Sequence, residues 1–225
     1  MFDIENDAQR LEIIEKLRKS GVKIPCSDGI IIEKTIPIGK GTVILPGTII
    51  MGESKIGENC VIGPNSYVCD THIGDTVTFK ASFTDKSTID DEASIGPFSQ
   101  LRPNSHIGKR VKIGDFVEVK NSTIDEKTSV AHLTYIGDSD VGSHCNFGCG
   151  TVTSNYDGKN KFRTTIGDNV FIGCNTNLIA PVTVESDSYI AAGSTITDTV
   201  PKDSLAIARS RQTIKEGWAK RNREK

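Results

Sequence analysis

Residues 95–118 read IGPFSQ LRPNSH IGKRVK IGDFVE, four consecutive six-residue units that each begin with Ile or Leu. The same unit recurs on both sides, as IGKGTV at 38–43, IGENCV at 56–61 and IGDNVF at 166–171. An internal period that persists along a chain is the signature of a repeat architecture, and here it dominates every other signal. The first and fifth side chains of each unit are expected to point inward, while Gly, Asp and Asn gather where the turn needs positive φ.

Each unit therefore reads as one short strand followed by one turn. Three such units close a triangular coil of about eighteen residues, and stacked coils exchange backbone hydrogen bonds at a spacing of ~4.8 Å. The composition agrees, because Ile (28) far outnumbers Leu (7) and β-branched residues favour strands. Aromatic residues make up 6% of the chain, as expected where inward positions are small. The sequence predicts an all-β, parallel β-helix of hexapeptide repeats.

The pattern also divides the chain. Residues 1–35 hold a short amphipathic helix, predicted over about 7–20, and a lead-in to the repeat. Residues 36–200 form the β-helix, in which the stretch 153–165 fits no single strand and turn and is expected to protrude as a loop. Residues 201–225 lack the repeat and read as an irregular tail.

Charge and cysteine content exclude several classes of function. A formal net charge of -2 gives no general attraction to nucleic acid or to an anionic membrane surface. No apolar run approaches the roughly 18 residues of a spanning helix, and the acidic start lacks the features of a signal peptide. We therefore expect a cytoplasmic protein, with its six cysteines as reduced thiols because they contain no CxxC pair. The histidines show no close ligand spacing, so no metal site is expected.

Counting through the shortened units and the loop aligns the inward side chains of successive coils on one side of the prism. Residues two positions later should stack in a second file, here called the groove file: Pro97, Asp115, His132, Cys149, Cys174 and Ala192. Beyond His132 this file and its neighbours are small, which predicts a shallow groove that leads a slender ligand arm to an imidazole. Taken alone, His132 also fits an ordinary surface residue, and the two cysteines fit groove-lining residues better than catalytic thiols.

A second file brings two cations together. Leu101 and Val119 occupy equivalent inward positions one coil apart, so Arg102 and Lys120 should be neighbours on one face. Adjacent like charges destabilise a strand pair, and a bound phosphate would remove that penalty. The alternative is two solvated bases that splay apart.

The chain resembles a known family through long motifs that occur in order. They are IGPFSQLRP, IGDFVEVKNS, HLTYIGD, NFGCGTVTSNYDGKNKFRT, IGDNVFIGCNTNLIAPVTV and LAIARSRQTIKEGW. They closely resemble the C-terminal acetyltransferase half of the bifunctional N-acetylglucosamine-1-phosphate uridyltransferase/glucosamine-1-phosphate acetyltransferases. The resemblance implies a left-handed β-helix and a homotrimer with sites between subunits, which the loop and tail reach across. Nothing here resembles the Gly-rich nucleotide loop of the other half, so no uridylyl transfer is expected.

The resemblance also implies roles for individual residues. It makes His132 the general base, assisted by Glu118, with Asn155 and Tyr156 positioning the amine and the acetyl group. The sugar phosphate would be bound by Arg102, Lys120, Tyr135, Asn146 and Lys161. Acetyl-CoA would run past Tyr156, Cys149, Cys174 and Ala192 toward Arg209. The family usually has Ala and Ser where Cys149 and Cys174 stand.

The function that the resemblance implies is acetylation of glucosamine 1-phosphate by acetyl-CoA, which supplies UDP-N-acetylglucosamine and cell-wall precursors. Two alternatives stay open. One is an acyltransferase of the same fold that acts on another phosphorylated or nucleotide-linked amino sugar. The other is a non-catalytic β-helix that serves as a partner protein.

Overall fold

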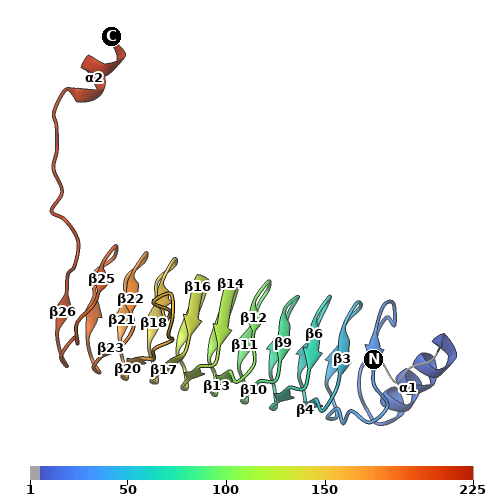
Figure 1. Ribbon diagram of the computed structural model, residues 1–225. Coiled ribbons are helices and arrows are strands. Elements are labelled where there is room, and N and C mark those ends of the chain that lie inside the picture. The colour runs from blue at the N-terminus through green and yellow to red at the C-terminus, as the bar shows by residue number, and fades with distance from the viewer. Residues whose placement is uncertain (1–5, 225) are drawn as a thin grey trace.

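The computed structural model describes residues 6–224, and it shows a straight stack of parallel coils. A helix closes one end of the stack, and a tail leaves the other end (Figure 1). Within these residues, every pairing between named strands is parallel. The predicted β-helix of hexapeptide repeats is confirmed.

The helix is α1 (Asp7–Lys19). The side chain of Asn6 caps its first turn by accepting a hydrogen bond from the Gln9 amide at 3.0 Å, and basic residues lie in its last turn. Ile14 is buried on its inner face, and Arg10 Nη1 donates to the Ser27 carbonyl at 2.9 Å. The helix therefore covers the first coil, whose apolar interior would otherwise face water.

The strands lie in two sheets. The 18-stranded sheet wraps two faces of the prism and comprises β1 (Ile31–Ile32), β2 (Val43–Ile44), β3 (Ile49–Met51), β5 (Val61–Ile62), β6 (Tyr67–Cys69), β8 (Thr78–Phe79), β9 (Phe83–Asp85), β11 (Ser94–Ile95), β12 (Gln100–Leu101), β14 (Lys112–Lys120), β16 (Ser129–Gly137), β18 (Asn146–Phe147), β19 (Val152–Ser154), β21 (Phe171–Ile172), β22 (Asn177–Ile179), β24 (Tyr189–Ile190), β25 (Thr195–Ile196) and β26 (Leu205–Ala206). The 8-stranded sheet forms the third face and comprises β4 (Lys55–Ile56), β7 (His72–Ile73), β10 (Thr88–Ile89), β13 (His106–Ile107), β15 (Thr123–Ile124), β17 (Ser139–Val141), β20 (Thr164–Ile166) and β23 (Val182–Val184).

The register follows the hexapeptide count. Ile31 pairs with Ile49, eighteen residues on, whereas Lys112 pairs with Ser129 because a unit between them is one residue short. The loop after β19 lengthens one coil, so that Phe147 pairs with Ile172. Inward positions therefore stay aligned through every change in coil length.

The interior combines large and small side chains as the repeat requires. First-position residues such as Ile44, Ile62 and Ile113 are fully buried and stack along the axis. Fifth-position hydroxyls satisfy turn carbonyls of the next coil, as Ser99 Oγ does by donating to Gly114 O at 2.5 Å. The core is thus a column of mostly aliphatic side chains, and among residues 6–224 only the Thr164 hydroxyl is buried without a hydrogen-bond partner.

The coiled region extends beyond residues 36–200 at both ends. β1 already pairs with β3, and at the far end β26 pairs with β24. Ala208 O still accepts from the Thr195 amide at 3.1 Å, after which the chain projects from the stack (Figure 1). The tail is not wholly irregular, because it ends in a short helix, α2 (Trp218–Arg223). Neither helix within residues 6–224 is long and apolar enough to cross a membrane.

Candidate active site

The imidazole of His132 lies on the prism edge that β14 and β16 cross without interruption. Asp115 and His132 are paired residues of these strands, one coil apart. His132 Nδ1 lies 2.9 Å from Asp115 Oδ1, and the two side chains are 61% and 42% exposed. The hydrogen bond to His132 is the main cause that lowers the pKa of Asp115, helped by the nearby Lys112 charge. Asp115 lies in the predicted groove file, but the hexapeptide count indicates no role for it.

The groove file continues past His132 through two exposed thiols. Phe147 pairs with Ile172, which sets Cys149 beside Cys174 on the next coil, and the Asn175 amide donates to Cys149 O at 2.8 Å. A Cβ added to Gly148 would lie 2.5 Å from Cys174 N, so only glycine allows this close approach. The file thus has the small, open character that the sequence predicts.

The far end of the groove file meets the start of the tail. Ala192 is exposed there, next to Gly193, whose φ is 73°. The Cδ atom of Arg209 is the only neighbour that a Cβ on Gly193 would meet within 4 Å among the described residues, at 3.7 Å. Arg209 therefore stands at the end of the groove file, the position to which the resemblance assigns it.

The predicted cation pair forms on the face beyond the His132 edge. Leu101 pairs with Val119, and the Arg102 amide donates to Val119 O at 2.8 Å, which makes Arg102 and Lys120 neighbours. The guanidinium of Arg102 donates through Nη1 to Glu118 Oε1 at 2.8 Å. Arg102 is thus neutralised by Glu118, and Lys120 is not part of that ion pair.

The loop adds a third cation, Lys161, to this face. Contact with Lys161 is the largest cause that lowers the pKa of Lys120, with a smaller contribution from Arg102 and an opposing one from Asp138. Like charges disfavour the protonated form, so the lowered pKa reports their crowding. A doubly charged anion between these ammonium groups would relieve it.

Tyr135 also lies on this face, with its ring over Gly137. It pairs with Glu118 on the preceding coil, and a Cβ added to Gly137 would lie 2.3 Å from the Tyr135 hydroxyl. Gly137 itself pairs with Lys120. The absence of a side chain at Gly137 lets the phenol lie flat over the backbone next to the lysine.

The loop between β19 and β20 is held by a buried carboxylate. Asn155 is 7% exposed and its amide donates to Asp138, which is 6% exposed and also accepts from Asn121. The resemblance assigns Asn155 to positioning the amine, whereas within this chain its amide N–H anchors the loop. Asp138 is a residue that sequence reasoning missed, because a hexapeptide count does not show which turn carboxylate is buried.

The rest of the loop folds as a small hairpin on the surface. Tyr156 and Lys161 form an isolated antiparallel bridge, and the Tyr156 hydroxyl donates to Gly158 O at 2.6 Å. Arg163 closes the loop by donating from two nitrogens to the carboxylate of Asp140. The phenol of Tyr156 is exposed and turned to its own loop.

Asn146 is the one expected phosphate ligand that lies apart from the others. It is exposed on β18, where it pairs with Ser129 on the face before the His132 edge. Arg102, Lys120 and Tyr135 lie on the face after that edge. A single chain therefore does not bring Asn146 to the cation cluster.

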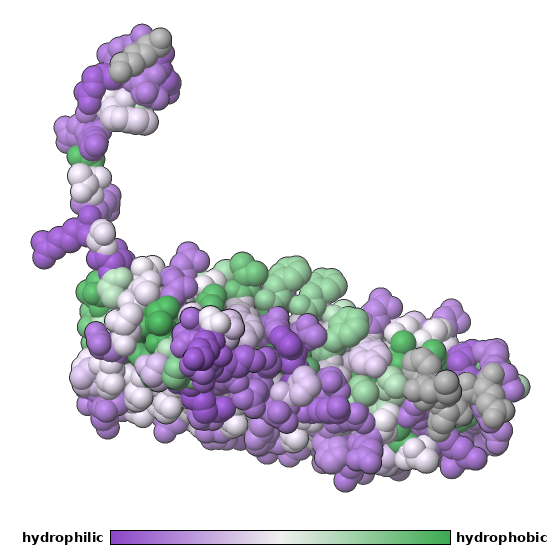
Figure 2. All heavy atoms as spheres, viewed as in Figure 1, coloured by the Kyte–Doolittle hydropathy of each residue, from purple (hydrophilic) through white to green (hydrophobic). Residues whose placement is uncertain are grey.

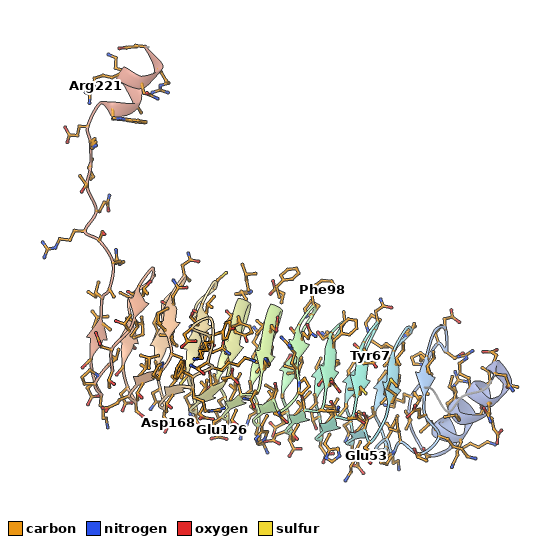
Figure 3. The ribbon with its side chains drawn as sticks, viewed as in Figure 1. Glu53, Tyr67, Phe98, Glu126, Asp168 and Arg221 are labelled. Carbon is orange, nitrogen blue, oxygen red and sulfur yellow. The ribbon has the colours of Figure 1, made fainter. Side chains whose placement is uncertain are left out.

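An exposed apolar file runs beside the groove file, and we call it the apolar edge: Phe98, Phe116 and Leu133. The rings of Phe98 and Phe116 stack with centroids 5.7 Å apart, and all three side chains are 58–62% exposed. Figure 2 shows apolar side chains gathered along this side of the stack, and Figure 3 shows Phe98 projecting from it. All three residues have positive φ, a conformation that is unfavourable for bulky side chains.

Comparison with known proteins gives two family matches. Residues 83–159 match the family described as GMPPB C-terminal domain. Residues 38–70 and 163–198 match the family described as bacterial transferase hexapeptide (six repeats). Among solved structures, UDP-N-acetylglucosamine acyltransferase from Francisella novicida shares 18% identity over 80% of this chain and 65% of that one, with a TM-score of 0.47.

Curated relatives are far closer in sequence. The bifunctional protein GlmU of Clostridium kluyveri is 56% identical over 200 residues, which are 89% of this chain and 44% of that protein. GlmU of Acetivibrio thermocellus is 54% identical over 209 residues, 93% of this chain and 45% of that protein. The chain thus spans less than half the length of the relatives that it matches. Together with the ordered motifs, these identities show that the chain is similar to the C-terminal acetyltransferase part of the GlmU proteins.

Proposed function

We propose that this chain transfers the acetyl group of acetyl-CoA to the amine of glucosamine 1-phosphate. The observation that carries the proposal is the position of His132. Its imidazole lies at the head of the groove file of small residues and next to a face where Arg102, Lys120 and Lys161 converge. A thioester arm and an anionic amino sugar would meet at that edge.

The chemistry requires a base at this place. An amine attacks a thioester only in its neutral form, and imidazole accepts protons near neutral pH. His132 would take a proton from the attacking nitrogen as the N–C bond forms. The C–S bond then breaks, and the thiol of CoA leaves with a proton. Glu118, held by Arg102, lies close enough in register to assist on the sugar side.

The cation cluster would select for a phosphorylated acceptor. Lys120 and Lys161 crowd each other, so a phosphate between them exchanges repulsion for two charge-assisted hydrogen bonds. The Tyr135 hydroxyl lies on the same face and offers a further donor. These side chains account for a phosphate group on the acceptor, and glucosamine as the sugar is proposed from the family.

The family also suggests a homotrimer with sites between subunits, acting in the cytoplasm. Two features support this assembly. The apolar edge exposes three large side chains at a backbone conformation that disfavours them, which is costly unless a partner covers them. The tail beyond residue 208 projects from its own stack (Figure 1), and a neighbouring subunit would give it a surface. Asn146 would then face a site that another subunit completes.

Assays of CoA thiol release with three acceptors test the proposal. Glucosamine 1-phosphate should react well, and glucosamine 6-phosphate and UDP-glucosamine poorly. Preference for UDP-glucosamine would favour the acyltransferase with another acceptor, and no release with any of them would favour the non-catalytic partner protein. The position of His132 next to the cation cluster favours catalysis, because a scaffold does not require this combination. His132→Ala, a change at a largely exposed side chain, serves as the folded, inactive control.

A further inference from the structure

Which nitrogen of His132 acts as the base is decided by its neighbour. Nδ1 lies 2.9 Å from Asp115 Oδ1. An ionised carboxylate only accepts hydrogen bonds, so the proton between these atoms belongs to Nδ1 in the neutral imidazole. The two ring nitrogens point away from each other, which leaves the lone pair of Nε2 on the side turned away from Asp115.

We propose that Asp115 is a positioning residue for acetyl transfer, which fixes His132 as the Nδ1–H tautomer and leaves Nε2 free to take the proton of the amine. This inference rests on the proposed function for its catalytic consequence, but the tautomer itself does not. The carboxylate would also stabilise the imidazolium that forms when the amine attacks. Neither role follows from the hexapeptide count, which places the two residues one coil apart without showing that they bond.

Among the charged groups around His132, Asp115 is the one that bonds to its ring. The hydrogen bond from His132 is the main cause that lowers the pKa of Asp115, and the charge of Lys112 on β14 acts in the same direction. Glu118 and Tyr135 lie three residues further along their strands, beyond the edge. On the coil that follows, the group in the same file is the thiol of Cys149. No second carboxylate bonds to His132 among residues 6–224.

The chain contains a matched pair for comparison. His106 on β13 has its Nε2 atom 2.9 Å from Oδ2 of Asp90, which directly follows β10 on the preceding coil, and these side chains are 46% and 42% exposed. This pair involves the opposite ring nitrogen and lies on another face from the candidate site. Removing Asp90 therefore controls for the loss of an exposed His–Asp contact as such.

Nitrogen-15 NMR of the histidine rings tests the tautomer without any substrate. At a pH where His132 is neutral, the intact protein should show mainly the Nδ1–H form at this residue, with resonances assigned by His132→Gln. Asp115→Ala should abolish that preference, and Asp90→Ala should leave it unchanged. A His132 ring that is mainly Nε2–H in the intact protein, or that is unaffected by Asp115→Ala, would overturn the proposal.

Kinetics test the catalytic consequence. A general base contributes about 10²–10⁴-fold, and because this pair is exposed to screening solvent we expect Asp115→Ala to lower kcat roughly tenfold. The KM values should change little. A kcat of Asp115→Ala that matches that of Asp90→Ala would refute the positioning role. Absence of turnover in the unmodified protein would instead refute the proposed function, and the NMR result would still decide the tautomer.

Discussion

At the scale of single residues, the strongest test of phosphate binding concerns Lys120. Replacing it with Ala removes one of the ammonium groups that would hold the phosphate, and a hydrogen bond to a charged group is worth about 1.5–3 kcal/mol. We expect KM for glucosamine 1-phosphate to rise roughly tenfold to a hundredfold with little change in kcat. Lys109→Ala, which removes a lysine paired with Glu92 on another face, should leave KM unchanged.

The charge of Lys120 also gives the binding a pH dependence. Lys161 lowers the pKa of Lys120, so Lys120 is charged below that lowered pKa and loses its charge as the pH rises through it. As the pH rises, affinity for the sugar phosphate should therefore begin to fall at a lower pH than it would if an isolated lysine held the phosphate. Lys161→Met should move the loss to higher pH, while weakening binding overall. If titration calorimetry finds the same pH dependence in both proteins, the two ammonium groups do not share one anion.

Much of the site at this scale could be predicted from the sequence. Counting by six correctly made Arg102 and Lys120 neighbours and placed His132 above the two cysteines, because a β-helix converts sequence distance directly into spatial register. The bonds of Asp115 and Asp138 could not be predicted in this way. The count fixes backbone positions, whereas side-chain hydrogen bonds depend on rotamers and on burial at each turn.

At the scale of elements, the loop between β19 and β20 depends on Asp138. This residue has a φ of 49°, and Asn tolerates that conformation, so Asp138→Asn tests the hydrogen bonds without adding backbone strain. The variant loses one acceptor for two amide donors, and a buried unsatisfied group costs about 1–3 kcal/mol. We expect a lower Tm and faster amide hydrogen exchange across residues 155–163.

Asp203→Asn is the matched control, because Asp203 has a φ of 58° and is exposed near the end of the stack. It should change neither Tm nor the exchange of the loop. Unaltered exchange of residues 155–163 in Asp138→Asn would show that the ion pair of Arg163 with Asp140 is sufficient to hold the loop.

Elements that break the repeat were predicted less completely than those that keep it. The sequence predicts the insertion after β19 because the stretch 153–165 cannot fit one strand and turn, but it shows neither the hairpin nor the anchor to Asp138. The end of the stack was also placed too early. β26 has no hexapeptide signature beyond a small and an apolar residue, yet its backbone pairs with β24 because the preceding coil offers unpaired groups.

At the scale of the whole molecule, the apolar edge predicts how copies assemble. Phe98 and Phe116 have φ values of 59° and 57°, so replacing both by Asn relieves backbone strain while removing the apolar surface. We expect the double variant to keep its fold by circular dichroism but to lose the trimer in analytical ultracentrifugation. Lys127→Asn, at a φ of 58° on a different prism edge, should remain trimeric. A double variant that stays trimeric would place the interface elsewhere.

The tail gives the sharpest test of sites shared between subunits. Truncation after Arg209 removes only residues beyond the last backbone contact with the stack, the hydrogen bond from Thr195 to Ala208, so the truncated chain should fold with an unchanged Tm. If the tail reaches a neighbouring subunit, the truncated protein should have a raised KM for acetyl-CoA. Refolding it together with full-length His132→Ala protein should then restore activity. In mixed assemblies, the inactive subunit supplies its tail to a neighbouring subunit that has an intact His132. Refolded mixtures that are no more active than the truncated protein alone would mean that each tail serves its own subunit or none.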